Sequence, residues 1–410
     1  MGSEVSLRRL TCTRSAFYHA GMPQGSSSAR GAGAGRGPRR RVLFVLPNLE
    51  PGGAERLVTR MLRHLPRDRI ELHLALVARY GLLLDDVPDE VQVHHLRAGR
   101  VRRAARPLIS LVWRIRPDVV LSTLGYMNLA LIPLWPFLPR GTQLFVREAN
   151  TLSAELPSHP RNRVLALAYR LLYPRADGII CPARAMADDL VRHFGIPASS
   201  IRYIPNPVDL ESLGQQTAGP SPFRGRGPHL LGVGRLAPQK GFDLMVSAFA
   251  ELSSALPEAQ LWVLGEGEER PALEAQAEAA GVGARVHLVG HVPNPYRWMR
   301  HADVFVLSSR YEGLPNVVLE AIASGAPVAA FDCPGGTREI LERVPGQSLV
   351  PFADVGALAE AILQRVRGGR ETVSPTLPEE YRLPNVVRAY ADLFCGLEDG
   401  SGAASGPSGC

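Results

Sequence analysis

Short apolar runs alternate with amphipathic stretches along most of the 410-residue chain. The first run, RVLFVLP at 41–47, leads through a Pro/Gly turn into a helix expected from Ala54. An apolar run of this length, bounded by turn residues, is typical of a buried parallel strand. Further strands are expected at 70–77, 91–96, 118–123, 143–148, 177–182 and 201–205.

The pattern begins again after residues 206–228, which are rich in Pro, Gly and polar side chains and are interpreted as a linker. Repeated strand–helix units predict a parallel sheet with helices on both faces. The sequence therefore predicts an α/β protein with two tandem Rossmann-like, doubly wound domains that face a cleft. Strands of the second domain are expected at 229–234, 259–265, 285–290, 303–309, 327–332 and 347–352.

The two expected domains span 41–205 and 229–382, and residues 383–396 are expected to form a final helix. Residues 1–40 hold mostly Gly, Ser, Ala and Arg, which predicts a disordered basic tail; a targeting peptide and a misassigned start codon are alternatives. A second disordered tail is expected at 397–410. The first tail lacks the apolar core of a secretory signal, and the five cysteines have no metal-binding spacing, which favours a reducing, cytoplasmic compartment.

The segment 119–139 carries no charge over 21 residues and is long enough to span a bilayer. Gly125, Pro133, Pro136 and Pro139 interrupt it, so a buried strand followed by a helix is the favoured interpretation. A milder alternative is an apolar, Trp-bearing surface that enters a membrane interface.

Charge is distributed unevenly along the chain. Residues 1–206 have a net charge of +15, and residues 207–410 have −8. A basic first half predicts an anionic partner, and an arginine-rich solvated surface is the plain alternative. Aromatic residues are not interleaved with the arginines as in nucleic-acid-binding modules, so an anionic membrane surface or a phosphate-bearing lipid is favoured over nucleic acid.

The stretch GVGRLAPQKG at 232–241 holds the only lysine of the chain among 46 basic residues. It leaves the first strand of the second domain and enters a helix, with Arg235 and Lys240 five residues apart. Two cations at such a turn can neutralise a diphosphate. Lysine is a compact point charge that a forked guanidinium does not always replace, so a functional role for Lys240 is favoured over a solvated charge.

The stretch PNLEPGGAERLV at 47–58 joins the first strand to the first helix. Gly52 and Gly53 let backbone N–H groups approach an anionic ligand at a helix N-terminus. A tight turn without a ligand is the alternative.

The most specific stretch is SSRYEGLPNVVLEAIASGAPV at 308–328. Glu312 stands just before a helix expected near Pro315, and Glu320 lies two turns inside it. The amides of Gly313 to Asn316 form the positive end of that helix, which suits phosphate. Two carboxylates so placed can accept hydrogen bonds from hydroxyls of two different sugars.

Three motifs occur together: Glu312 and Glu320 in the E-x7-E spacing with GLP after the first Glu, GRLxxxKG before them, and PGGAE near the start. This combination resembles the family-4 retaining glycosyltransferases of the GT-B fold over residues 41–395. PGGAER, SSRYEGLPN and CPGGTREIL are similar to the bacterial members that extend polysaccharides or lipid-linked oligosaccharides.

The resemblance implies a role for each matching residue. Glu320 would hold the ribose of a nucleotide sugar, Glu312 would contact the donor hexose, and Arg235 and Lys240 would hold the diphosphate. Glu312, Lys240 and Arg235 are thus the expected catalytic residues. The expected donor-binding residues are Glu320, Gly313, Leu314, Asn316, Gly234, Val292, Gly52 and Gly53. In this fold the final helix crosses back onto the first domain.

One departure concerns the acceptor side. Family members commonly carry a histidine after the fifth strand of the first domain, and this chain has FVREANTLS there. Arg147, Glu148 and Asn150 are therefore the expected acceptor-side residues, and the resemblance assigns no acceptor-activating histidine.

The implied activity is metal-independent, retaining transfer of a hexose or N-acetylhexosamine from a nucleotide sugar, preferably a UDP-sugar, to a glycan or lipid-linked glycan. Neither a metal ion nor another cofactor is expected: no DxD motif occurs, and Pro88 breaks the helix that DDVPD at 85–89 would need to bind magnesium. A nucleotide-sugar isomerase of the same fold and an inactive nucleotide-binding regulatory partner are the alternatives. The expected location is the cytoplasm or the cytoplasmic face of a membrane, and no nucleic-acid partner is expected.

Overall fold

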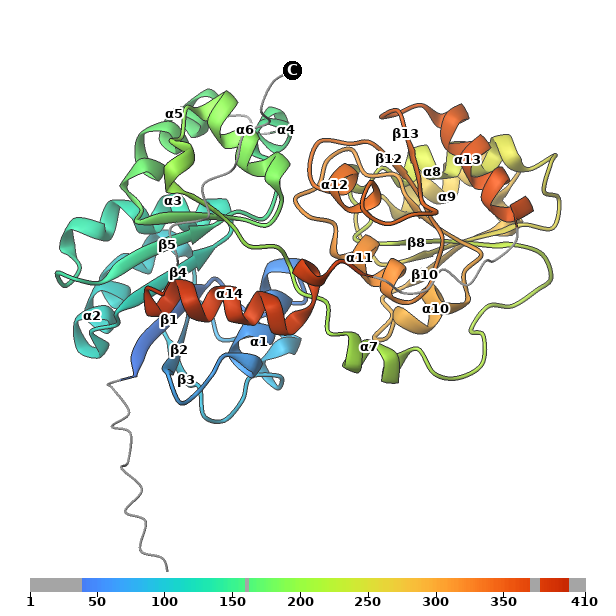
Figure 1. The fold of residues 1–410 in the computed structure, drawn as a ribbon. Helices are drawn as coiled ribbons and strands as arrows, with labels where there is room; N and C mark the ends of the chain where they lie inside the picture. The colour runs from blue at the N-terminus through green and yellow to red at the C-terminus, as the bar shows by residue number, and fades with distance from the viewer. Residues whose placement is uncertain (1–38, 159–161, 369–376, 398–410) are drawn as a thin grey trace, which may run out of the picture. The chain divides into compact units, whose positions relative to one another are not determined.

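Two parallel sheets, one of seven strands and one of six, organise the computed structural model (Figure 1). The structure describes residues 39–158, 162–368 and 377–397. The two expected terminal tails lie outside these residues except at Arg39, Arg40 and Leu397, and Arg40 belongs to the first strand rather than to a tail. Each apolar run expected to be a strand is a strand, and the α/β fold with two Rossmann-like domains is confirmed.

The first sheet has the strand order β3-β2-β1-β4-β5-β6-β7. The order reverses between β1 and β4, and parallel sheets of this kind bind ligands at the carboxyl ends of the strands beside such a reversal. Its strands are β1 (Arg40–Leu46), β2 (Ile70–Leu76), β3 (Gln92–His95), β4 (Val119–Thr123), β5 (Gln143–Arg147), β6 (Gly178–Cys181) and β7 (Ile201–Tyr203).

The helices of the first domain follow the apolar periodicity of their sequences. The first helix, α1 (Gly53–His64), turns Leu57, Val58, Met61 and Leu62 into the core and its arginines away from it. The other helices are α2 (Ala105–Ile115), α3 (Gly125–Leu131), α4 (Leu152–Glu155), α5 (Asn162–Leu172) and α6 (Arg184–Phe194). Short 3-10 turns include η1 (Leu82–Leu84), η2 (Val101–Arg103), η3 (Ile132–Phe137), η4 (Leu156–Ser158), η5 (Tyr173–Arg175) and η6 (Ala198–Ser200).

The second sheet has the order β10-β9-β8-β11-β12-β13, with the reversal between β8 and β11. Its strands are β8 (His229–Val233), β9 (Gln260–Leu264), β10 (Val286–Gly290), β11 (Val304–Leu307), β12 (Val328–Phe331) and β13 (Ser348–Val350). Its helices are α8 (Phe242–Leu252), α9 (Arg270–Ala279), α10 (Tyr296–His301), α11 (Asn316–Ala323), α12 (Thr337–Leu341) and α13 (Val355–Gly368), with turns η7 (Pro238–Lys240) and η8 (Gly283–Arg285).

The segment interpreted as a linker contains a helix, α7 (Leu210–Gln216). Asp209 caps it, because the carboxylate of Asp209 accepts a hydrogen bond from the Ser212 amide at 3.0 Å. Just before the cap, Val208 pairs with Arg382 in an isolated parallel bridge. An acidic N-cap followed by Leu213 on the buried side is the local signal for this helix, and the high Pro and Gly content around it obscured that signal.

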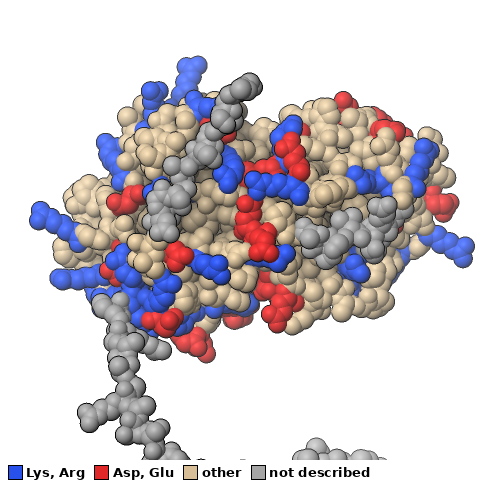
Figure 2. Space-filling model, in the orientation of Figure 1, with Lys and Arg blue, Asp and Glu red and all other residues tan. Residues whose placement is uncertain are grey.

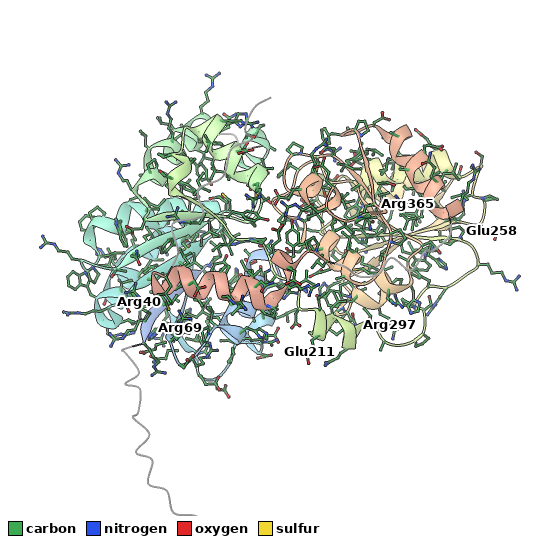
Figure 3. The ribbon with its side chains drawn as sticks, in the orientation of Figure 1. Arg40, Arg69, Glu211, Glu258, Arg297 and Arg365 are labelled. Carbon is green, nitrogen blue, oxygen red and sulfur yellow. The ribbon has the colours of Figure 1, made fainter. Side chains whose placement is uncertain are left out.

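The last helix, α14 (Leu383–Cys395), follows the turn η9 (Glu379–Tyr381) and packs against the first sheet (Figure 1). The rings of Phe394 and Phe44 meet edge to face with centroids 5.9 Å apart. Arg40 donates from Nε to the carbonyl of Phe394 at 3.2 Å, and Arg69 lies 3.6 Å from the carboxylate of Asp392; Figure 3 labels both arginines. The C-terminal helix is thus part of the core of the first domain.

The uncharged segment 119–139 forms β4, α3 and η3, as the favoured interpretation expected. Within the described residues, no helix combines the length and apolar character that crossing a bilayer requires.

Candidate active site

The turn after β8 places Lys240 beside the end of β11. The chain leaves β8 at Val233, forms η7 and turns at Gly241, which has a left-handed φ of 59°. A Cβ at Gly241 would lie 2.2 Å from the carbonyl oxygen of Ser308, so only glycine lets the two loops approach this closely. Ser308 closes the contact by donating from its hydroxyl to the Lys240 carbonyl at 3.1 Å.

Lys240 and Glu312 form an ion pair, with Nζ 2.6 Å from Oε1. The hydroxyl of Ser309 donates to the same carboxylate oxygen at 2.6 Å. Glu312 is only 5 % exposed, so its charge is stabilised by these two partners rather than by water. Gly234 lies alongside, where an added Cβ would be 3.4 Å from the Lys240 side chain.

The loop between β11 and α11 presents free amide groups next to this pair. Among the described residues, the N–H groups of Gly313 and Leu314 donate to no partner. The carbonyl of Gly313 accepts from the Gly336 amide at 2.7 Å, and the amide of Glu312 donates to Pro334 at 2.9 Å. The segment CPGGTREIL therefore holds the loop in place, and its free N–H groups lie at the positive end of α11, which favours anions.

The same loop touches the first domain. A Cβ at Gly313 would lie 2.0 Å from the Ala149 carbonyl, and Thr151 donates from its hydroxyl to the Glu312 carbonyl at 2.7 Å. At the start of α11, Asn316 accepts a hydrogen bond from the Asn206 amide group at 2.7 Å. A Cβ at Gly53, the first residue of α1, would lie 3.4 Å from the side chain of Asn316. The PGGAER turn and the loop after β5 thus meet the EGLPN loop directly.

Glu320 lies inside α11, eight residues after Glu312, and is 7 % exposed. Arg60 of α1 lies 3.3 Å from Oε1 of Glu320, and the hydroxyl of Tyr296 donates to the same oxygen at 3.4 Å. Arg60 also donates to the carbonyl of Pro207 at 2.9 Å, which fixes its direction. A polar cavity of about 180 Å³ opens beside these groups, with Pro293 and Arg56 on its walls.

Arg235 and Val292 stand apart from these contacts. Arg235 is exposed, and no described residue pairs with or hydrogen-bonds its guanidinium. It is free to bind an anionic ligand, but the structure does not bring it into contact with Lys240 or Glu312. Val292 is half-buried, two residues beyond β10 and next to the cavity wall at Pro293.

The acceptor-side residues Arg147 and Glu148 are both buried, each 2 % exposed. Arg147 donates to the side-chain oxygen of Asn206, which links it to Asn316. Glu148 accepts from Asn128 at 3.1 Å and from the hydroxyl of Tyr173. Burial raises the pKa of Glu148 to about 8, so the carboxyl is protonated at neutral pH.

Asn150 is half-buried and accepts a hydrogen bond of 3.4 Å from Gln239, the residue before Lys240. Gly52 lies in the turn before α1, and a Cβ there would be 2.2 Å from the carboxylate of Glu55. Glu55 is buried, and this burial raises its pKa. Of the acceptor-side residues, Asn150 is thus the one placed beside the Lys240 turn.

Sequence reasoning missed Arg60, Tyr296 and Ser309. Ser309 lies inside the quoted motif and could have been recognised as a hydroxyl three residues before Glu312. Nothing in the sequence distinguishes Arg60 from the other arginines, because its role depends on a contact between residues 260 positions apart.

Two family models match the chain. Residues 51–212 match Glycosyltransferase Family 4, and residues 227–367 match Glycosyl transferases group 1. Together the two ranges cover more than half of the chain and contain every residue of the sites described above.

Curated relatives are glycosyltransferases as well. The chain is 28 % identical to the N-acetylgalactosamine-N,N'-diacetylbacillosaminyl-diphospho-undecaprenol 4-alpha-N-acetylgalactosaminyltransferase of Campylobacter jejuni, over 73 % of this chain and 83 % of that protein. It is 31 % identical to the 2-deoxystreptamine N-acetyl-D-glucosaminyltransferase of Streptomyces fradiae, over 65 % and 58 %. An uncharacterized glycosyltransferase of Methanocaldococcus jannaschii is 26 % identical, and the match spans less than two thirds of its length (62 %).

Solved structures agree with the fold. HepE of Anabaena, determined in complex with UDP and glucose, superimposes with a TM-score of 0.69 at 20 % identity, over 88 % of this chain and 100 % of that chain. The apo form of the lipopolysaccharide outer core galactosyltransferase WaaB gives 0.65 at 17 % identity, over 87 % and 99 %. These structures have the GT-B arrangement of two Rossmann-like domains. The chain therefore belongs to the family-4 glycosyltransferases and has their GT-B fold.

Proposed function

We propose that the protein transfers a hexose or an N-acetylhexosamine from a UDP-sugar to a glycan or a lipid-linked glycan, with retention of the anomeric configuration. The observation that carries the proposal is the arrangement at the end of β11, where Lys240, the buried Glu312 and the free amides of Gly313 and Leu314 lie on adjoining turns. The names of the Campylobacter and Streptomyces relatives support an N-acetylhexosamine as the transferred sugar, the Campylobacter name supports a lipid-linked acceptor, and the UDP bound to HepE supports a UDP-sugar donor.

The donor is expected to bind along the second domain. Its diphosphate lies against Lys240, Arg235 and the amides of Gly313 and Leu314, which together present positive charge and N–H donors. Glu320 accepts hydrogen bonds from the ribose, and Glu312 accepts one from a hydroxyl of the sugar. The remaining donor contacts come from the turns that carry Gly234, Val292, Asn316, Gly52 and Gly53.

The chemical step breaks the bond between the anomeric carbon and the β-phosphate oxygen. Positive charge develops on the sugar and negative charge on the diphosphate, where Lys240, Arg235 and the amides stabilise it more strongly than in the ground state. The acceptor hydroxyl attacks from the face that the diphosphate leaves. Its proton passes to the leaving phosphate oxygen, so the products are UDP and a glycoside of retained configuration.

On the acceptor side, Asn150 is proposed to reach the acceptor, since it borders the Lys240 turn. Arg147 and Glu148 are proposed to position the loop that carries Asn150, because both are buried and bonded to protein partners. Two cations and two amides supply the charge stabilisation that a divalent ion would supply elsewhere. We therefore propose a metal-independent reaction, and EDTA should leave its initial rate unchanged. We also propose that the reaction takes place in the cytoplasm or at the cytoplasmic face of a membrane.

The test is a screen of UDP-, GDP- and ADP-sugars with purified protein, with and without a glycan acceptor. We expect UDP and a new glycoside whose anomeric proton coupling matches that of the donor, and we expect Glu320→Ala to abolish both products. Formation of an epimerised nucleotide sugar without acceptor would identify an isomerase. Nucleotide binding without any turnover would identify a regulatory partner.

A further inference from the structure

An apolar cavity of about 250 Å³ lies in the first domain, between η2 and α2 on one side and α3 and η3 on the other. Among the described residues that line it, Arg102 alone carries a charge. Its walls include Ala105, Leu108, Met127, Ala130 and Leu134. The cavity is distinct from the polar one beside Glu320, with which it shares no lining residue.

The size and the lining of this cavity suit a hydrocarbon. An apolar cavity of about 150 Å³ is enough to hold a benzene molecule, and this one is larger. Arg102 and Pro133 are exposed, and Ala105 and Leu134 are partly exposed, so the cavity can be reached from solvent. An apolar hollow at the surface with one cationic residue on its wall favours an amphiphile with an anionic head.

The segment that forms the cavity is strongly basic. Residues 97–140 contain eight arginines and a single acidic residue, Asp118, which is bonded to Arg41 and Arg40. Within the described part of the chain, none of the eight forms an ion pair or donates a hydrogen bond from its guanidinium. Figure 2 shows arginine side chains projecting from the edge of the first domain that carries α2. Unpaired like charges on one segment of the chain favour a bound anion. The eight are Arg97, Arg100, Arg102, Arg103, Arg106, Arg114, Arg116 and Arg140.

Two exposed aromatic residues sit on the elements that form the cavity. Trp113 of α2 is 50 % exposed, and Phe137 of η3 is 63 % exposed. They are neighbours, because the indole of Trp113 donates to the carbonyl of Phe137 at 2.9 Å. Exposed aromatic rings among arginines are typical of a surface at the level of lipid headgroups.

Helix α3 connects the cavity with the candidate active site. Met127 and Ala130 line the cavity, while Asn128 between them donates to Glu148 at 3.1 Å and to the Arg147 carbonyl at 3.0 Å. The helix has seven residues, which makes it about 10 Å long. A chain bound in the cavity therefore lies about one helix width from the acceptor side of the site.

We propose that this cavity binds the hydrocarbon chain of a phosphate-bearing lipid, the lipid part of the acceptor, with the η2 arginines on its phosphate. That the lipid belongs to the acceptor rests on the proposed function. Binding of the chain itself does not, because it needs no donor.

The experiment is a calorimetric titration of the full-length protein with butyl, hexyl, octyl and decyl phosphate below their micellar concentrations. Each added methylene should raise the affinity about fourfold until the chain fills the cavity, after which the affinity should level off. Ala105→Phe and Ala130→Phe, which fill the cavity from opposite walls, should each weaken octyl phosphate binding at least tenfold. Arg102→Ala should weaken every member of the series by the same factor, and inorganic phosphate alone should not bind measurably.

Ala250→Phe on α8 is the matched control, since Ala250 is also a half-buried helical alanine but lies in the second domain. It should bind octyl phosphate like the wild type, and thermal unfolding should show which variants are folded. The proposal would be overturned if both cavity-filling variants bound octyl phosphate as tightly as wild type. It would also be overturned if the affinity kept rising up to decyl phosphate without levelling off. A third contrary result is that wild type and the cavity-filling variants all bind anionic phospholipid vesicles while none binds alkyl phosphates.

Turnover of UDP-sugars, measured in the absence of lipid, separates this proposal from the proposed function. It should be unchanged in Ala130→Phe and Arg102→Ala. A protein that binds octyl phosphate as expected but turns over no nucleotide sugar would refute the proposed function and leave the lipid cavity standing. Normal sugar transfer without alkyl phosphate binding would refute the lipid cavity and support the proposed function.

Discussion

Nζ of Lys240 lies 2.6 Å from Oε1 of Glu312, so the only lysine of the chain and the first glutamate of the E-x7-E motif form one ion pair. Sequence reasoning placed the two residues at different parts of the donor, the diphosphate and the hexose. Their contact means that the carboxylate orients the ammonium group before the donor binds. The lysine still has two further N–H bonds to offer, because an ammonium group carries three donors.

Replacing Lys240 by arginine tests whether the site needs a point charge. Lys240→Arg keeps the charge, but a planar guanidinium is longer and has to fit between Gly234 and the Glu312 carboxylate. We expect UDP-sugar turnover to fall by about 10- to 100-fold, which is less than the roughly 100- to 1000-fold cost of losing one transition-state donor, because the charge is kept. Steady-state kinetics of the purified variant measures this.

Arg226→Lys is the matched control, since Arg226 is exposed, has no partner among the described residues and is not part of the proposed site. Its turnover should stay within about threefold of wild type, because an ammonium group at an unconstrained position keeps the charge. A wild-type rate in Lys240→Arg would mean that the lone lysine has no special role.

Arg60 pairs with the Glu320 carboxylate, which is proposed to bind the ribose. Its guanidinium lies 3.3 Å from Glu320, so a nucleotide has to displace it. The pair is mostly buried, with the two side chains 22 % and 9 % exposed, so the cost of removing both charges from water offsets most of their attraction. If the net contribution is about 1 kcal/mol, Arg60→Ala should tighten UDP binding by up to about fivefold. Isothermal titration with UDP measures the change.

The control for Arg60 is Arg63→Ala on the same helix, because Arg63 pairs with Asp86 rather than with Glu320. UDP affinity should not change in that variant. Weaker UDP binding by Arg60→Ala would show instead that Arg60 contacts the nucleotide directly.

The strands and the order of the motifs could be predicted from the sequence, because apolar runs such as 41–47 and 303–309 carry the strand signal within themselves. Glycine-rich turns next to those runs gave the positions of the EGLPN and PGGAER loops in the same way. These features depend on neighbouring residues only.

What could not be predicted depends on contacts between distant residues. The Arg60–Glu320 pair joins α1 to α11, and one arginine among 45 gives no sign of it. The cavity between α2 and α3 arises from the packing of separate segments, although the apolar run at 131–138 suggested a membrane-facing surface. The burial of Glu148 likewise depends on Tyr173 and Asn128, which the motif does not include.

Glu148 should make the stability of the protein depend on pH. Its pKa is raised from 4.5 to about 8, so between these values the folded state holds a proton that the unfolded chain has released. Stability should therefore be highest below pH 4.5 as far as this group is concerned, and should fall as the pH rises to 8 by up to about 1.4 kcal/mol per pH unit.

Glu148→Gln removes this titration while keeping a hydrogen-bonding side chain opposite Asn128 and Tyr173. The variant should be more stable than wild type by about 2–4 kcal/mol at pH 8 and nearly equal to it at pH 5, as measured by urea unfolding at both pH values. Glu360→Gln, at an exposed position on α13, should leave the pH profile of wild type unchanged. An identical profile for Glu148→Gln would refute the assignment.

Gly313 allows the EGLPN loop to lie against the loop after β5. A methyl group there would fall 2.0 Å from the carbonyl oxygen of Ala149, so Gly313→Ala has to displace one loop from the other. A shift of about 1 Å at a reacting centre can cost about 100-fold in rate, and we expect a loss of that order in UDP-sugar turnover. The unfolding free energy should fall by about 1–3 kcal/mol, as for other overpacked contacts.

Gly214→Ala in α7 provides the comparison, because a Cβ at Gly214 meets no heavy atom within 4 Å. That variant should keep wild-type turnover and gain about 0.5–1 kcal/mol, the usual benefit of alanine over glycine inside a helix. If Gly313→Ala behaved like Gly214→Ala in both assays, the close approach of the two loops would have no part in donor turnover. The contrast therefore tests the geometry of the site independently of any charged residue.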